Sequence, residues 1–531
     1  MAADTSGQVT GGQALVRALE ELGVEVAFGL PGVHNLAAWK AFPGSGVRLV
    51  GVRHEQTAGY AADGYARATG RLGVAITTTG PGASNVVTAT GEAWASHSPL
   101  LVIATDIPTT VRRPDSYRGV LHETTDQASF FRPVTKAQLR AGSVEEVART
   151  VALGGRLAME HPRRPVYLEI PTDLLTALGE AEPAPAAEAE ERPCDVAAVL
   201  PLLDAARRPL LWAGGGATAS GAGPAITALA ARLGAPVVTS YGGRGLLPPD
   251  SPSLVPLPPH APEAGALWDA ADLVLVLGSD LDAMNTQGFR QPRPPVVVSV
   301  DLVEPVNVEP DVRVDADVAR AVDALLDALP ARERPAWWER PDRVLPAAEG
   351  QFLRALEDAL PEDAVLVADM CVPGYWYGGY GRVGRPRGLA YPVGWGTLGF
   401  GFPAGLGAAL SGRPAVALVG DGGFLFACGD LATAAQERLP LTVVLVDDGG
   451  YGMLAYDFTK DGQQPVGCDL EPPDFVALAQ AFRVRAREVD VEGLGAAVAA
   501  GVASGEPNLV VLKASYLPPP NTSPRWYRAQ P

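Results

Sequence analysis

The chain has 531 residues, 47% of them hydrophobic and 19% charged, which predicts several folded domains and excludes a disordered protein. Its formal net charge of −18 argues against nucleic-acid binding, because phosphate backbones are bound by basic surfaces. Four scattered cysteines and six histidines without metal-ligand spacing predict neither a disulfide framework nor a zinc site. The N-terminus lacks the pattern of a signal peptide, and no apolar run has membrane-spanning length, so we expect a cytoplasmic protein.

The first part of the chain alternates helical periodicity with short apolar strands. Helices are expected at 12–22 and 57–69, the second of them directly after His54-Glu55-Gln56. Strands are expected near 24–28, 47–53, 73–79 and 100–105. Alternation of this kind predicts a parallel sheet, because parallel strands need a crossover connection. We therefore expect an N-terminal α/β domain over residues 8–180.

Two segments rich in proline and charged residues, 180–193 and 331–346, predict linkers that divide the rest of the chain. The first is followed by a Rossmann-like central domain over 194–330, and the second by a third α/β domain over 350–531. A Gly214-Gly215-Gly216 turn in the central domain is weak evidence for a nucleotide, and a purely structural block is favoured. The predicted fold class is α/β, with three doubly wound parallel-sheet domains.

Two glycine-rich turns in the third domain carry the strongest chemical signal. The apolar strand 415–419 ends at Gly420-Asp421-Gly422-Gly423, and the strand 441–446 ends at Asp447-Asp448-Gly449-Gly450. A helix-like segment to about Arg438 joins the two strands, so both turns are expected at one edge of a parallel sheet. Magnesium prefers oxygen ligands such as carboxylates. Phosphate binds to backbone N–H groups at the start of a helix, which glycine leaves accessible. The pattern predicts a site for a metal–diphosphate.

Three further segments carry a family resemblance. They are the run Arg53-His54-Glu55 to Arg67, the turn Gly80-Pro81-Gly82-Ala83-Ser84-Asn85, and the segment Gly394-Trp395-Gly396-Thr397-Leu398 to Pro403. Together with the Gly-Asp-Gly turn, the chain resembles the thiamine-diphosphate enzymes of the acetolactate synthase and benzoylformate decarboxylase type. The resemblance extends over most of the chain. It implies the cofactors thiamine diphosphate and Mg²⁺, with the first domain binding the pyrimidine ring and the third the diphosphate.

The resemblance also assigns roles to single residues. Glu55 would be the catalytic glutamate that hydrogen-bonds the aminopyrimidine ring, with Leu398 and the Gly396 carbonyl shaping the folded cofactor. Asp421, Asp448 and the Gly450 carbonyl would bind Mg²⁺; the family usually has asparagine first in the pair that is Asp447-Asp448 here. The remaining cofactor-binding candidates are Pro81, Asn85, Val372, Pro373, Gly422, Gly423, Tyr451, Gly452 and Met453. In the family the site joins two subunits, which implies a homodimer or homotetramer.

The loop with His122 and Glu123 bears on the reaction. It matches the loop that carries a His-His pair in simple 2-oxo acid decarboxylases and Gln-Glu in acetolactate synthases, so both residues are catalytic candidates. The favoured function is decarboxylation of a small-molecule 2-oxo acid followed by carboligation to a second carbonyl. Release of an aldehyde, as in benzoylformate- or phenylpyruvate-type decarboxylases, is the alternative.

Three other interpretations have less support. A catalytically silent cofactor-binding subunit would not need Glu55 beside Asp421 and Asp448. A nicotinamide dehydrogenase would need a ribose-binding acid after a Gly-x-Gly-x-x-Gly turn. The region 256–265 lacks the segment with which acetolactate synthases bind flavin, which makes FAD doubtful.

Overall fold

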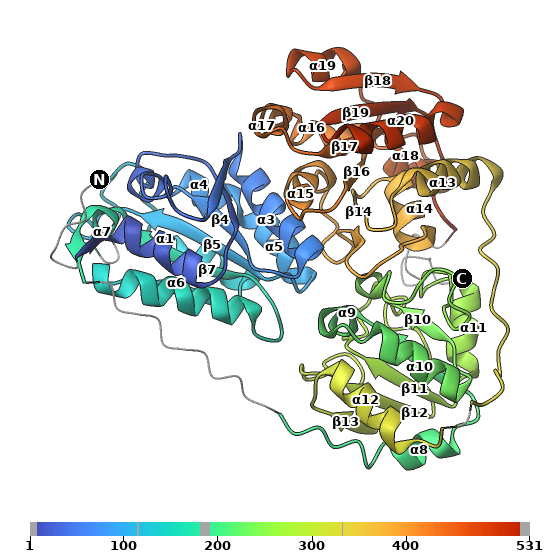
Figure 1. Cartoon of the computed structure of the whole chain (residues 1–531). Coiled ribbons are helices and arrows are strands. Elements are labelled where there is room, and N and C mark those ends of the chain that lie inside the picture. The colour runs from blue at the N-terminus through green and yellow to red at the C-terminus, as the bar shows by residue number, and fades with distance from the viewer. Residues whose placement is uncertain (1–7, 114–115, 181–191, 332, 521–531) are drawn as a thin grey trace.

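The computed structural model describes residues 8–113, 116–180, 192–331 and 333–520 and contains three α/β units, each built on its own parallel sheet (Figure 1). The predicted fold class is therefore confirmed. Most of the first predicted linker and the end of the third predicted domain lie outside the described residues. Within the described residues, no helix combines the length and apolarity needed to cross a membrane.

The first unit is a six-stranded parallel sheet of order β3-β2-β4-β5-β7-β6. β4, β5 and β7 are buried along their whole length, as expected for strands covered by helices on both faces. The strands are β2 (Val26–Gly29), β3 (Arg48–Gly51), β4 (Gly73–Thr77), β5 (Leu100–Asp106), β6 (Ala137–Arg140) and β7 (Val166–Pro171). The helices are α1 (Gly11–Glu21), α2 (Leu36–Trp39), α3 (Glu55–Thr69), α4 (Pro81–Asn85), α5 (Val87–Ala95), α6 (Val144–Met159) and α7 (Thr172–Thr176). A short antiparallel pair, β1 (Val9–Thr10) with β8 (Leu178–Gly179), joins the two ends of this unit.

The central unit has the sheet order β10-β9-β11-β12-β13. Its strands are β9 (Pro209–Ala213), β10 (Val237–Thr239), β11 (Leu273–Leu277), β12 (Val296–Val300) and β13 (Val312–Val314). Its helices are α8 (Leu200–Ala205), α9 (Gly215–Ser220), α10 (Gly223–Leu233), α11 (Pro262–Ala270) and α12 (Val318–Ala328). A Cβ on Gly216 would lie 2.7 Å from Gly278 Cα, so this glycine allows two turns to pack backbone against backbone.

The third unit has the sheet order β15-β14-β16-β17-β19-β18. Its strands are β14 (Val365–Ala368), β15 (Leu389–Ala390), β16 (Ala415–Gly420), β17 (Leu441–Asp447), β18 (Arg485–Val489) and β19 (Asn508–Lys513). Its helices are α13 (Ala347–Ala359), α14 (Val372–Tyr380), α15 (Gly401–Ala408), α16 (Asp421–Leu425), α17 (Leu431–Glu437), α18 (Gly452–Lys460), α19 (Phe475–Ala481) and α20 (Val491–Ser504). β16 and β17 are parallel and pair from Ala415↔Leu441 to Gly420↔Val446, so the two glycine-rich turns leave the sheet side by side.

The connection after β16 is not the continuous helix that its sequence suggests. It consists of α16, a 3-10 turn at Cys428–Asp430 and α17. The break places the buried Asp430 carboxylate against the start of α3, where it accepts hydrogen bonds from the Arg53 N–H (2.8 Å) and the Thr57 hydroxyl (2.7 Å). The break falls at Gly429 and Asp430, which are poor helix formers, and it permits this contact between two units.

Helices α3 and α15 hold the first and third units together within one chain (Figure 1). Their contact depends on glycine: a Cβ on Gly64 would collide with the Ala404 carbonyl, and one on Gly407 would collide with the Ala61 carbonyl. The two backbones consequently touch without intervening side chains. Their buried residues belong to one continuous hydrophobic core that spans both sheets.

Candidate active site

Asp421 occupies the end of β16 and the first position of α16. Only 1% of its surface is exposed, and neither carboxylate oxygen has a hydrogen-bond partner among the described residues. A buried carboxylate without hydrogen-bond partners is costly, because the charge has lost its water, and the nearby Gly422 N–H only partly opposes the effect of burial on its pKa. Such an orphaned acid indicates a missing partner of positive charge.

The partner strand β17 delivers two more carboxylates to the same place. Burial is the main cause that raises the pKa of Asp421, to about 7, and the negative charges of Asp448 and Asp447 raise it further. Burial likewise raises the pKa of Asp448. A Cβ on Gly452 would overlap the Asp448 carboxylate, so only glycine lets that carboxylate fold back over its own turn. The concentration of negative charge is relieved only by protons or by a cation.

Glycines also let the two turns approach each other. A Cβ on Gly422 would lie 2.6 Å from the Tyr451 ring, and one on Gly423 would lie 2.8 Å from Asp369 Oδ2. The turns are thus in direct contact, with main-chain N–H groups at the starts of α16 and α18. No cluster of three metal-binding side chains occurs among the described residues, so a metal here needs main-chain oxygen such as that of Gly450 to complete its ligands. Hard oxygen donors of this kind fit Mg²⁺.

Asp369, at the end of β14, is a site residue that the sequence interpretation missed. Both of its carboxylate oxygens accept from the Gly399 N–H at 3.1 Å, and Oδ1 also accepts from the Met370 N–H at 2.8 Å. Burial raises the pKa of Asp369 to about 6. This residue therefore anchors the segment 394–400 that carries Gly396 and Leu398. The sequence does contain a signal for Asp369, because a carboxylate directly follows the apolar strand β14, three positions before Val372 at the start of α14.

Glu55, in the first unit, is the first residue of α3 and is 5% exposed. Asn85 donates a hydrogen bond to its Oε2 at 2.9 Å, and a Cβ on Gly82 would lie 3.2 Å from its Oε1. Pro81 begins the short helix α4 that carries both contacts. The turn 80–85 thus forms the wall beside the glutamate.

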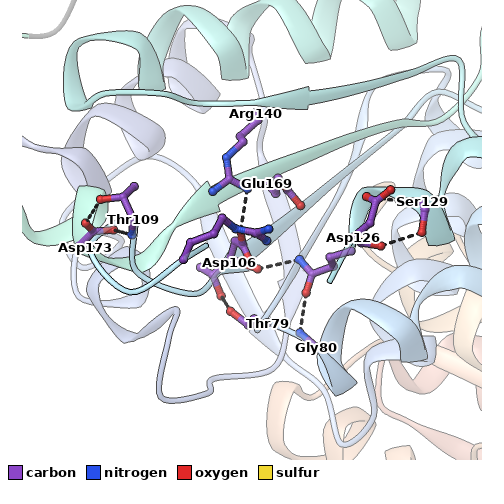
Figure 2. Close-up of polar contacts among 12 residues, drawn as sticks. Thr79, Gly80, Asp106, Thr109, Asp126, Ser129, Arg140, Glu169 and Asp173 are labelled. Atoms are coloured by element: carbon purple, nitrogen blue, oxygen red, sulfur yellow. Dashed lines mark hydrogen bonds and ion pairs between the residues drawn. The ribbon is translucent and has the colours of Figure 1, made fainter. Parts of the chain in front are cut away.

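A buried polar network fixes that turn from behind (Figure 2). The Gly80 N–H donates to Gln127 Oε1 at 2.6 Å, and Gln127 Nε2 donates to the Thr105 carbonyl and the Tyr167 hydroxyl. Tyr167 donates to Glu169, and Arg140 then links Glu169 to Asp106. No local sequence pattern indicates this role for Gln127, because its partner Gly80 lies 47 positions away.

His122 and Glu123, the two catalytic candidates of the loop that follows β5, differ in their surroundings. His122 has a left-handed backbone (φ 65°) and packs on Gly80, where a Cβ would lie 3.1 Å from the His122 Cβ. Glu123 instead accepts from the Val120 and Arg118 N–H groups at 2.9 Å, and these hydrogen bonds lower its pKa. His122 therefore lies at the turn beside Glu55, whereas Glu123 closes its own loop.

The structure brings the predicted residues together in two groups. Asp421, Gly422, Asp448 and Tyr451 meet in the third unit, and Glu55, Asn85 and His122 border the turn 80–85 in the first. Among the described residues, no hydrogen bond or ion pair connects Glu55 with the two glycine-rich turns that follow β16 and β17 in the same chain. The single chain presents two half-sites.

Comparison with known proteins places the chain in a family. The N-terminal TPP binding domain, the central domain and the C-terminal TPP binding domain of the thiamine pyrophosphate enzymes match residues 9–130, 196–329 and 371–512. A protein of Pseudomonas aeruginosa named "Probable 2-ketoarginine decarboxylase" is 38% identical, over 95% of this chain and 94% of its own length. The "Probable acetolactate synthase large subunit" of Methanocaldococcus jannaschii is 29% identical (94% and 91% covered), and the "Acetolactate synthase" of Mycobacterium bovis 31% (90% and 83%).

The three parallel sheets and the strand-end carboxylates define an α/β enzyme of thiamine-diphosphate chemistry. The chain belongs to the thiamine pyrophosphate enzyme family and is a thiamine-diphosphate-dependent enzyme of 2-oxo acid decarboxylation. The family resemblance noted in the sequence is thereby confirmed.

Proposed function

We propose that Asp421, Asp448 and the Gly450 carbonyl hold Mg²⁺, and that the N–H groups around Gly422, Gly423, Gly452 and Met453 hold the diphosphate of the cofactor. Tyr451 would line the diphosphate without its own N–H, which donates to the Cys468 carbonyl. The observation that carries this proposal is the buried Asp421 carboxylate without a partner. A divalent cation would neutralise the charge that raises its pKa, and the adjacent helix starts favour bound phosphate. Asp447 adds charge next to this set without being needed as a ligand.

The cofactor supplies the electron sink that makes loss of CO2 from a 2-oxo acid possible. Within the chain, Glu55 would hydrogen-bond the aminopyrimidine ring and assist its proton transfers. Asn85 holds the Glu55 carboxylate in one orientation. Asp369 holds Gly399 and so keeps Gly396 and Leu398 in position to shape the cofactor.

We propose release of an aldehyde as the outcome of the reaction, with carboligation as the second candidate. Release needs a proton donor near the reacting carbon, and His122 lies beside the turn next to Glu55. The 38% identical relative, whose name is that of a decarboxylase, favours the same outcome. Carboligation, which the sequence favours, has its support in the synthases at 29% and 31% identity and stays a prediction.

We further propose a dimer as the smallest active form. The two half-sites of one chain share no hydrogen bond or ion pair among the described residues, although α3 and α15 hold their units together. A second copy would bring its third unit to the Glu55 of the first. The expected cytoplasmic location and the choice between dimer and tetramer stay predictions.

Product analysis tests this function. The purified protein, with thiamine diphosphate and Mg²⁺, is supplied with pyruvate, benzoylformate, phenylpyruvate and 2-ketoarginine, singly and in pairs. Aldehyde and CO2 as main products would support release, whereas a hydroxyketone or acetolactate would establish carboligation. Absence of CO2 from every substrate, with the cofactor bound, would contradict the proposed decarboxylation of these 2-oxo acids.

A further inference from the structure

Four buried polar atoms without hydrogen-bond partners gather at one edge of the first sheet. They are His34 Nδ1, Thr78 Oγ1, Asp106 Oδ1 and His122 Nδ1, each unpartnered among the described residues. His34 follows β2, Thr78 follows β4, and Asp106 is the last residue of β5; these three strands are neighbours in the sheet. Buried polar atoms normally have partners, so a concentration of exceptions at the carboxyl edge of a parallel sheet indicates a binding place.

His34 is the least expected member of this cluster. Its ring meets that of His122 edge to face, with centroids 5.2 Å apart and an interplanar angle of 77°. Only 8% of His34 is exposed. Its turn is rigid, because Asn35 bridges the Gly32 N–H (2.7 Å) and the Leu30 carbonyl (3.0 Å) and Thr172 donates to the His34 carbonyl. Two imidazoles from loops 88 positions apart are thus held as a pair (122 − 34).

The imidazole pair lies next to the wall of the Glu55 half-site. A Cβ on Gly32 would lie 2.6 Å from the Thr78 side chain, and one on Gly82 would lie 2.7 Å from the Thr78 methyl group. Thr78 therefore separates the His34 turn from Gly82, which itself contacts Glu55. His122 adjoins Gly80 at the start of the same turn.

The charge around the pair is balanced. Arg112 and Arg140 both donate to Asp106 Oδ2, at 2.8 and 2.6 Å, so the charge of this carboxylate is neutralised. Burial and the neighbouring His122 lower the pKa of His34, whereas Asp106 opposes that shift. His34 is therefore held as a neutral imidazole, which carries one N–H donor.

We propose that His34 and His122 together bind the carboxylate of the 2-oxo acid substrate. The inference rests on the proposed decarboxylation. The loop that carries a His-His pair in simple 2-oxo acid decarboxylases has one histidine here, His122, and His34 would supply the second imidazole from a separate loop. A neutral donor such as His34 suits the task, because the carboxylate charge leaves that position as CO2 forms. A guanidinium at the same place would stabilise the ground state more than the transition state.

Two variants of His34 separate binding from packing. His34→Phe keeps a ring against His122 and removes the hydrogen-bonding atom, whereas His34→Asn restores a short polar side chain. His97→Gln is the control, because His97 precedes β5 at the opposite edge of the sheet, where it contacts Arg164. Affinity for oxamate, an unreactive 2-oxo acid analogue, is measured by calorimetry on protein loaded with thiamine diphosphate and Mg²⁺.

We expect His34→Phe to weaken oxamate binding about tenfold and to raise KM by a similar factor, with cofactor affinity and Tm unchanged. His34→Asn is expected to recover part of that loss, and His97→Gln to match the wild type. Equal oxamate affinity in His34→Phe and wild type, or no oxamate binding by loaded wild type, would overturn the inference. Failure of the cofactor itself to bind would instead overturn the proposed function.

Discussion

Glu55 and Asp421 are the same kind of residue in the same kind of place, yet their surroundings differ. Each is a buried carboxylate at the first position of a helix that follows a parallel strand. Glu55 accepts a hydrogen bond from Asn85, whereas neither oxygen of Asp421 has a partner among the described residues. The chain itself supplies a hydrogen bond to the first carboxylate and none to the second. Position in the fold alone therefore does not distinguish the role that we propose for Glu55, contact with the cofactor, from the role that we propose for Asp421, binding of a cation.

The largest expected effect is that of Glu55→Gln. The amide keeps the size of the side chain and removes its charge, so kcat should fall about 10²- to 10⁴-fold, the range for loss of a general acid–base group. Cofactor affinity, followed by fluorescence quenching, should stay within a few-fold of wild type. Glu123→Gln is the control, because the hydrogen bonds of Glu123 within the described part of the chain come from the N–H groups of Arg118 and Val120 in its own loop. Full activity of Glu55→Gln would refute the role given to Glu55.

Asp421→Asn tests the other carboxylate, and its two effects have opposite signs. Mg²⁺-dependent cofactor binding should weaken about 100-fold, because a charged metal ligand is lost. The metal-free protein should become more stable, because an unpartnered buried charge is removed.

Asp430→Asn is the matched control for stability. Asp430 is equally buried but accepts hydrogen bonds from the Arg53 N–H, Thr57 and Thr433. We expect the Asp430 variant to lose about 1–3 kcal/mol in the free energy of unfolding. A lower Tm for metal-free Asp421→Asn would contradict the proposed cation site.

Asn85→Ala should have an intermediate effect. It removes the hydrogen bond to Glu55 Oε2 without touching the carboxylate, so we expect a loss of about tenfold in kcat. Because Asn85 acts through Glu55, the double variant with Glu55→Gln should be no worse than Glu55→Gln alone. Additive losses in the double variant would show that Asn85 acts independently.

The smallest effect on catalysis is expected for Gln127→Leu, which removes the support behind the turn 80–85. The variant leaves the Gly80 N–H without its partner and removes the hydrogen bond that the Tyr167 hydroxyl accepts, so the free energy of unfolding should fall by about 1–3 kcal/mol. We expect only a few-fold change in kcat at a temperature where the variant is folded. Denaturant unfolding and initial rates on the same samples measure both.

The features visible in the sequence are those encoded locally. Apolar strands followed by glycine and aspartate predicted the position of Asp421 beside the Asp447-Asp448 pair, and β16 and β17 pair as expected. Residues whose role depends on distant partners were missed: Gln127 supports Gly80, and His34 meets His122. The break after α16 was also missed, and the contact that it permits, between Asp430 and Thr57 of α3, joins residues 373 positions apart. Hydrophobic periodicity predicts helices and strands from residues close in sequence, whereas these contacts join residues that are far apart in the sequence.

The backbone contact between α3 and α15 has a mechanical consequence. Helices that slide or hinge on one another do so across layers of side chains that change rotamer, and here Gly64 and Gly407 leave no such layer. We therefore expect the first and third units of one chain to move together. An opening that admits a substrate would then come from loops or from a movement between whole chains, because a hinge between these two units would break the backbone contacts of Gly64 and Gly407.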